Sequence, residues 1–140
     1  MASPEEAARQ LRELGKRIEI NADKLIIETS LAVLSELVVG TPVDTGRARG
    51  NWLVGRGSPR RPLPETIASL IDPSGQQTIQ TGASSIRQRR PGVVLYISNN
   101  VPYIGRLNDG SSAQAPSGFI EMAVQAGVAV ARRARLLEPV

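Results

Sequence analysis

The stretch TPVDTGRARGNW, residues 41–52, gathers a proline, an aspartate, two glycines, two arginines and the only tryptophan of the chain. It lies between a long helical pattern and the first run of strand-forming residues. Pro42 fixes φ and starts a turn, and Gly46 permits a positive φ. We therefore expect a sharp corner here, at which the chain leaves a helix and enters a strand over residues 51–56.

The polar side chains of this corner have both an architectural and a functional interpretation. Asp44 is placed to accept hydrogen bonds from the backbone amides of Thr45 and Gly46, which would hold the turn. Arg47 and Arg49 are expected to project from the start of the strand, and Arg47 is also placed to pair with Asp44. Because such corners are more often architectural than catalytic, we expect this one to aim the following sheet at neighbouring subunits.

Before the corner, residues 4 to about 39 carry the pattern of one long helix. Ser3 is a suitable N-cap, and Pro4 occupies the favoured first helical position. Apolar residues recur at a heptad-like spacing along the first half, interrupted by Asn21, and a second apolar stripe broadens the face near the C-terminal end, where Gly40 stops the helix. The first half is expected to pack against a neighbouring subunit, and the second half on its own domain.

After the corner, the sequence predicts a mixed core over residues 41–137 and a short C-terminal tail. Residues 93–98 predict the clearest strand, whose near-continuous apolarity indicates burial on both faces or a covered edge. A short helix is expected over 101–108 and a closing helix over 119–137. The inner side of the closing helix would carry Ile120, Ala123, Val124, Gly127, Val130, Ala131 and Ala134. The chain of 140 residues is thus expected to form one α+β domain with a small, mostly antiparallel sheet.

The composition argues against catalysis. The chain has no histidine and no cysteine, so the commonest general base and the thiolate metal ligands are missing. No nucleophile elbow, phosphate loop or dinucleotide fingerprint occurs, and the acids of the second half are scattered. We expect no catalytic residue, cofactor, metal or small-molecule substrate. A hydrolase that uses two of the scattered carboxylates remains the enzymatic alternative.

The hydropathy of the chain gives no sign of a membrane segment. No apolar run approaches the roughly 20 residues that span a bilayer. The first ten residues, MASPEEAARQ, are polar and acidic rather than typical of a signal peptide. We therefore expect a protein that is made and kept in a cytoplasm and has no membrane partner.

The charges are unevenly distributed. Residues 1–40 carry seven acids and five bases, whereas residues 41–140 carry six acids and twelve bases. Arginine donates hydrogen bonds in pairs to phosphates and carboxylates, so the basic second half favours DNA or an acidic protein as a partner as much as it favours simple solubility. The arginines expected to face such a partner are Arg60, Arg61, Arg87, Arg89 and Arg90.

A second motif lies in YISNNVPYIGRLNDGSSAQAPSGFIEMAV, residues 96–124. Together with the corner, and in this order, it resembles the neck and tail-completion family of tailed double-stranded DNA phages, over about residues 35–130. The corner matches the family pattern at Val43, Asp44, Thr45, Gly46, Arg47, Arg49 and Trp52. The second motif matches it at Asn99, Asn100, Pro102, Tyr103, Leu107, Gly110, Ser112, Gln114, Ala115, Pro116 and Gly118.

This resemblance implies a structural virion protein without enzymatic activity. Family members are similar to ring components, usually sixfold, that complete the tail or join it to the head. The implied partners are copies of the chain itself, the adjacent head-closure or adaptor protein, and the tail terminator or tube. Packaged DNA would pass through the ring without sequence-specific contacts. The implied location is the head–tail junction of a virion assembled in the host cytoplasm, and the loop of the second motif is expected to dock onto the next ring.

One further class stays open. A small basic protein that binds DNA without sequence preference, dimeric through its N-terminal helix, would also fit the charge distribution. That alternative predicts tight duplex binding with a steep dependence on salt.

Overall fold

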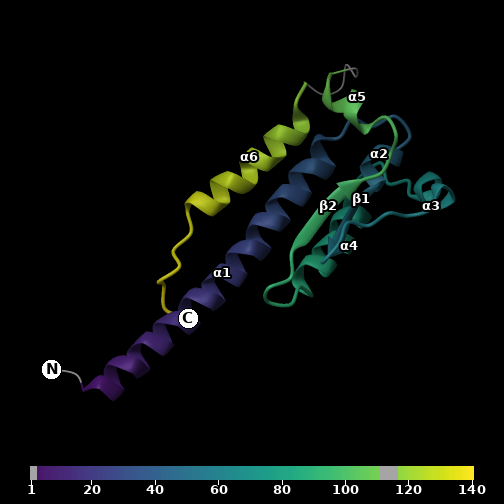
Figure 1. Cartoon of the computed structure of the whole chain (residues 1–140). Coiled ribbons are helices and arrows are strands. Elements are labelled where there is room, and N and C mark those ends of the chain that lie inside the picture. The colour runs from purple at the N-terminus through teal and green to yellow at the C-terminus, as the bar shows by residue number, and fades with distance from the viewer. Residues whose placement is uncertain (1–2, 111–116) are drawn as a thin grey trace.

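The computed structural model of the chain describes residues 3–110 and 117–140 and has the expected α+β architecture (Figure 1). A long N-terminal helix, a two-stranded antiparallel sheet and a C-terminal helix form its frame. The elements in chain order are α1 (Pro4–Gly40), α2 (Arg47–Gly50), β1 (Trp52–Arg56), α3 (Pro64–Ser69), α4 (Gln76–Arg87), β2 (Leu95–Asn99), α5 (Ile104–Asn108) and α6 (Phe119–Arg132).

Helix α1 begins and ends where its sequence signals predict. Ser3 is the N-cap and its Oγ accepts a hydrogen bond from the Glu6 amide at 3.1 Å, with Pro4 in the first turn. With 37 residues the helix is about 55 Å long at the usual rise per residue. Its C-terminal end holds the buried residues Leu34, Leu37 and Val38. The second half of the predicted helix therefore packs on its own domain, as expected.

The core surrounds this C-terminal end of α1. Helix α6 runs along one side of α1, and α4 with the sheet lies on the other (Figure 1). Two glycines allow the helices to come close, because a Cβ on Gly127 of α6 would lie 2.4 Å from the Val33 side chain, and one on Gly82 of α4 would lie 2.5 Å from Leu34. The buried apolar cluster consists of Leu34, Leu37, Val38, Trp52, Val54, Ile86, Phe119 and Ala123.

The closing helix is shorter than predicted and buries a narrower stripe. It ends at Arg132 rather than at residue 137, and the chain then follows α1, where the Asn21 side chain donates hydrogen bonds to the carbonyls of Leu136 and Glu138 at 2.7 and 2.9 Å. The interruption of the heptad pattern by Asn21 is therefore the docking point of the C-terminal tail.

The predicted inner side of that helix is partly wrong. Phe119, Ala123 and Gly127 are buried because they lie four residues apart and form one line facing α1. Val124 is exposed, being one position off that line. Ala131 and Ala134 are exposed as well, since the chain leaves the helix at Arg132.

The second strand is also shorter and less buried than expected. It spans Leu95–Asn99 and pairs antiparallel with β1, with Trp52 opposite Asn99 and Arg56 opposite Leu95. Val94 and Tyr96 are exposed, so neither burial on both faces nor a fully covered edge describes it. The apolar run exceeded what a two-stranded sheet on one helix can cover, because one face of such a sheet meets solvent.

The first four turns of α1 project beyond the rest of the molecule (Figure 1). We call residues 4–16 the arm. Leu11 and Leu14 of the arm are exposed, at 68% and 37%, and just beyond the arm the Arg17 Nη1 donates to the Leu137 carbonyl at 3.5 Å. A segment of this length is marginally stable as an isolated helix in water. The arm thus presents two exposed leucines on one face of the helix, one turn apart.

Within the described residues, α1 and the shorter helices all fall short of the combination of length and apolarity needed to cross a bilayer.

Candidate functional site

The corner is a single helical turn rather than the start of the strand. Arg47 and Arg49 lie in α2, which is set off by Gly46 at φ 93°, and the strand begins only at Trp52. The positive φ of Gly46 was predicted correctly, and a Cβ there would also lie 2.6 Å from the Pro73 nitrogen. The expectation that both arginines project from a strand is wrong, because residues 47–50 form a helical turn and the strand starts after them.

The hydrogen bonding of the corner also differs from the expected pattern. The Thr45 Oγ1 accepts the Arg47 amide at 3.2 Å and so performs the role that the sequence assigned to Asp44. Among the described residues, Asp44 forms neither a side-chain hydrogen bond nor an ion pair with Arg47. Asp44 is exposed at the surface of the corner.

Arg49 ties the corner to two other segments. Its Nη1 donates to the Pro73 carbonyl at 2.8 Å, and its Nη2 donates to the carbonyls of Val39 and Thr41 at 3.1 and 2.8 Å. Burial lowers the pKa of the Arg49 guanidinium from its usual value, and the charge of Asp72 partly offsets this effect. Arg49 therefore binds the last carbonyls of α1, which lack partners within the helix.

Asn51 and Trp52 complete the corner from inside. Asn51 is fully buried, and its Nδ2 donates to the carbonyls of Arg47, Ile67 and Leu70 at 2.8 to 3.2 Å. The Trp52 Nε1 donates to the Thr41 Oγ1 at 2.7 Å, and that hydroxyl donates in turn to the Leu37 carbonyl at 2.6 Å. Sequence reasoning did not single out Asn51, although a polar residue between a helical turn and a buried strand residue is a recognisable signal.

Asp72 organises the turn on which the corner packs. Its Oδ2 accepts the Thr78 amide and hydroxyl, both at 2.8 Å, and its Oδ1 accepts the Gly75 amide at 3.1 Å and the Ser74 hydroxyl at 3.3 Å. Burial alone would raise the pKa of this carboxyl, but these hydrogen bonds together outweigh burial and lower the pKa below its usual value. Asp72 and Ser74 thus share the capping of α4, with the Asp72 Oδ2 on the Thr78 amide and the Ser74 Oγ accepting the Gln76 amide at 3.2 Å.

We expect Asp72→Asn to destabilise the fold by about 1–3 kcal/mol at neutral pH. The Thr78 amide and hydroxyl both donate to the Asp72 Oδ2, and the side-chain NH2 of asparagine would place a third donor against them. The folded-state pKa lies below the unfolded value, so the stabilisation is fully present above the unfolded pKa of about 3.9 and is lost as the pH falls through the folded value. Urea unfolding of both proteins across this range should give a difference that shrinks towards acid pH. The matched control is Asp109→Asn, at an exposed carboxyl, and an equal effect of both changes would contradict the assignment.

The asparagines of the second motif connect it to the corner. The Asn99 Nδ2 donates to the Ala48 carbonyl in α2 at 2.8 Å, and its Oδ1 accepts the Val101 amide at 3.1 Å. The Asn100 Nδ2 donates to the Arg60 carbonyl at 2.9 Å. Both asparagines therefore have architectural contacts, and the two motifs form one structural unit.

The later part of the second motif leads into α6. Gly110 and Gly118 have positive φ, and Gly118 is the N-cap of α6. Asn108, which sequence reasoning missed, donates from Nδ2 to the Glu121 carboxylate at 2.9 Å and accepts the Ile120 amide at 2.9 Å. The second-motif residues Ser112, Gln114, Ala115 and Pro116 lie outside the described residues.

The two motifs meet in an open surface hollow of about 410 Å³. One wall is formed by residues 42–48 of the corner, and the other by Tyr103, Arg106 and Leu107. Pro102, by contrast, is exposed beside it. We call this cavity the corner hollow. It brings the charged groups of Asp44, Arg47 and Arg106 to one concave surface with apolar surroundings, which the sequence spacing alone did not predict.

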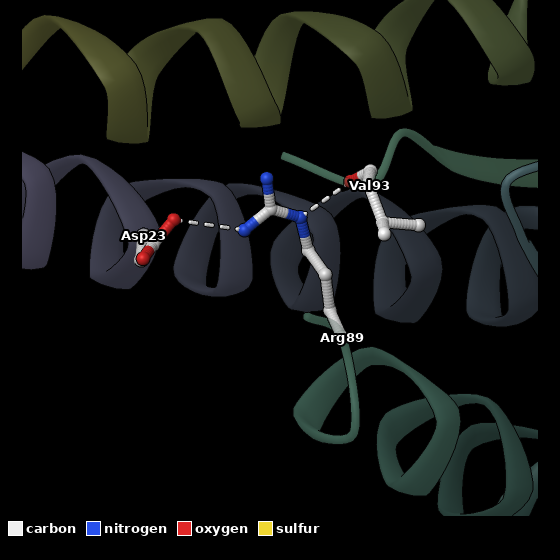
Figure 2. A network of polar contacts seen from close by, with 3 residues as sticks. All are labelled: Asp23, Arg89 and Val93. Atoms are coloured by element: carbon white, nitrogen blue, oxygen red, sulfur yellow. Dashed lines mark hydrogen bonds and ion pairs between the residues drawn. The ribbon is translucent and has the colours of Figure 1, made fainter. Parts of the chain in front are cut away.

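The arginines expected to face a partner divide into two groups. Arg60, Arg61, Arg87 and Arg90 are exposed. The Arg89 side chain is only 6% exposed, and it donates to the Asp23 carboxylate at 3.0 Å and to the Val93 carbonyl at 2.7 Å (Figure 2). Arg89 thus holds the turn before β2 against α1 and does not present its charge to a partner.

The described residues contain no group of acids that is arranged to hold a metal ion. Comparisons of the chain with protein-family models, with curated proteins and with solved structures returned no match. The site is therefore interpreted from its own geometry and from the two motifs.

Proposed function

We propose that this chain is a structural, non-enzymatic subunit of a ring at the head–tail junction of a tailed double-stranded DNA phage, where the ring completes the tail or joins it to the head. The observation that carries the ring is the arm, which projects from the domain and exposes Leu11 and Leu14 (Figure 1). The assignment to a phage neck rests on the resemblance of the two motifs, which meet in one structural unit.

The arm supports repeated contacts between copies. A stripe of exposed leucines on a projecting helix has no core of its own to enter, so burial against another subunit would both remove apolar surface from water and stabilise the helix. The arm projects at one end of α1, and the corner lies at the other (Figure 1). If the arm contacts a different surface of the next copy, the interface is heterologous, and a heterologous interface with a closing rotation generates a ring.

The exposed arginines support a second feature of the proposed ring. Arg60, Arg61, Arg87 and Arg90 leave their charges available to a phosphate backbone or an acidic neighbouring protein. DNA passing through the ring would be bound weakly and without sequence preference, and the affinity would fall as the salt concentration rises. The neighbouring proteins in this proposal are the head-side adaptor and the tail terminator or tube.

The native mass of the purified protein at moderate salt tests the proposal. We expect a discrete species of about six copies, which is about 90 kDa for a chain of 15.0 kDa. The variant Leu11→Glu with Leu14→Glu should sediment as a monomer, because burying two carboxylates in an apolar interface is costly. Sedimentation velocity over a range of protein concentrations measures both.

The matched control changes the net charge by the same amount on the opposite face of the arm. Arg9→Gln with Arg12→Gln removes two positive charges without altering the leucines, and it should leave the assembled mass unchanged. A wild-type protein that stays monomeric up to millimolar concentration would contradict assembly through the arm. A stable dimer that gains mass with duplex DNA would favour the DNA-binding alternative instead.

A further inference from the structure

We propose that the corner hollow is a receptor for a carboxylate side chain, flanked by apolar residues, from a partner protein. The identity of that partner as a neighbouring protein of the virion rests on the proposed function. The chemistry of recognition rests on the hollow itself, which is lined by Arg47, Arg106 and Asp44 together with apolar side chains.

The two arginines of the hollow differ in burial, since Arg106 is exposed and Arg47 is partly buried, but both lack an acceptor among the described residues. Within residues 3–110 and 117–140, neither side chain forms a hydrogen bond or an ion pair. The Arg47 Nε is buried and has no acceptor. The Arg49 Nε is likewise buried without an acceptor, so the groups available to an anion in the hollow are the unpaired Nη ends of Arg47 and Arg106 rather than this nitrogen.

Two other arginines of the protein bind acceptors within the fold. Arg49, two positions along the same helical turn, donates from its Nη atoms to three carbonyl groups. Arg89 binds a carboxylate and a carbonyl (Figure 2). The fold thus engages these two guanidinium groups internally and leaves the pair at the corner hollow open, from two segments about sixty residues apart in the chain.

The size and lining of the hollow favour a single carboxylate over a phosphate backbone. Arginine forks bind carboxylates and phosphates alike. The hollow, however, is an open surface depression of about 410 Å³ with Pro42, Val43 and Leu107 in its wall, and it carries the acidic Asp44. A duplex with its high charge density would meet repulsion from Asp44 and would gain nothing from the apolar wall. A single carboxylate beside an aliphatic side chain matches both features.

Peptide binding to the full-length protein tests this proposal. The probe is the blocked peptide acetyl-Ala-Leu-Glu-Leu-Ala-amide, and the control probe carries Gln in place of Glu. The readout is the side-chain Nε–Hε NMR resonances of isotope-labelled arginine. We expect a saturable shift of the Arg47 and Arg106 resonances with the Glu peptide and none with the Gln peptide. Duplex DNA should shift the resonances of Arg60, Arg61, Arg87 and Arg90 before those of Arg47 and Arg106.

Variants separate recognition from general electrostatics. Arg106→Gln should weaken binding of the Glu peptide by about tenfold or more, because one charge-assisted contact is lost, whereas Arg12→Gln on the arm should not change it. Asp44→Asn should strengthen binding severalfold, since it removes a like charge from the hollow. A purely structural role of these residues would not produce opposite effects.

The result that would overturn the proposal is a peptide that leaves both resonances unchanged, or one whose binding is the same in wild type and Arg106→Gln. Preferential saturation of these two resonances by duplex DNA would also overturn it. Failure of ring assembly is distinguishable, because Leu11→Glu with Leu14→Glu alters the native mass at a surface remote from the hollow and should leave peptide binding unchanged.

Discussion

Trp52→Ala is expected to lower the free energy of unfolding by about 3–5 kcal/mol, the usual cost of truncating a buried aromatic side chain. Trp52 is only 5% exposed and lies in the apolar cluster formed by α1, β1, α4 and α6. Truncation opens a cavity at the point where these elements meet. It also removes the donor to the Thr41 hydroxyl, which is fully buried at the end of α1.

Thermal and urea unfolding followed by circular dichroism measure this effect. For a domain of this size the expected loss corresponds to a melting temperature lower by about 10 °C or more. Trp52→Phe is the matched control, because it retains an aromatic ring and loses the Nε1 donor. Its cost should be smaller, about 1–2 kcal/mol. A loss below about 1 kcal/mol for Trp52→Ala would mean that the corner is not anchored in the core.

Arg49→Met is the second change with a large expected effect, a loss of about 2–4 kcal/mol. The guanidinium donates to the carbonyls of Pro73, Val39 and Thr41, and two of these lie at the C-terminal end of α1. A cation near that end also complements the helix dipole. Methionine keeps most of the aliphatic stem and removes only the donors, so the loss reports the hydrogen bonds rather than packing.

The control lies two residues away in the same helical turn. Arg47→Met should change the free energy of unfolding by less than about 1 kcal/mol, because the Arg47 side chain makes no hydrogen bond among the described residues. Arg49→Lys should restore only part of the stability, since one ammonium cannot reproduce the planar fork that reaches two segments. Equal losses for Arg47→Met and Arg49→Met would refute this division between a structural and a ligand-facing arginine.

The corner illustrates how far local sequence reasoning extends. The turn, the positive φ of Gly46 and the strand from Trp52 onward follow from backbone rules that act over a few residues. The sequence assigned the acceptor that holds the turn to Asp44, with the amides of Thr45 and Gly46 as donors, whereas the observed acceptor is the Thr45 Oγ1 and the donor is the Arg47 amide. Both side chains are exposed, so their burial could not have distinguished them.

The candidate partner-facing residues illustrate the same limit. The basic character of the second half of the chain was evident from composition, but Arg89 turned out to bind Asp23, 66 residues earlier in the chain. The two arginines that line the corner hollow come from different motifs, and the spacing between those motifs contains no information about their distance in space. The positive charge of these arginines was evident from the sequence, but their roles depend on burial and on pairing with residues that are distant in the chain.

The amino-acid sequence by itself determined the elements with strong local signals, namely α1 with its Ser3 cap, the corner at Gly46 and the α+β class of the fold. Capping, φ preferences and helical periodicity act between near neighbours, so they can be read along the chain. The tertiary structure alone decided that α6 ends at Arg132, that Asn21 binds the C-terminal tail, and that Arg47 and Arg106 share one hollow. These outcomes depend on which surfaces meet, and contacts between residues distant in sequence form only when the whole core packs.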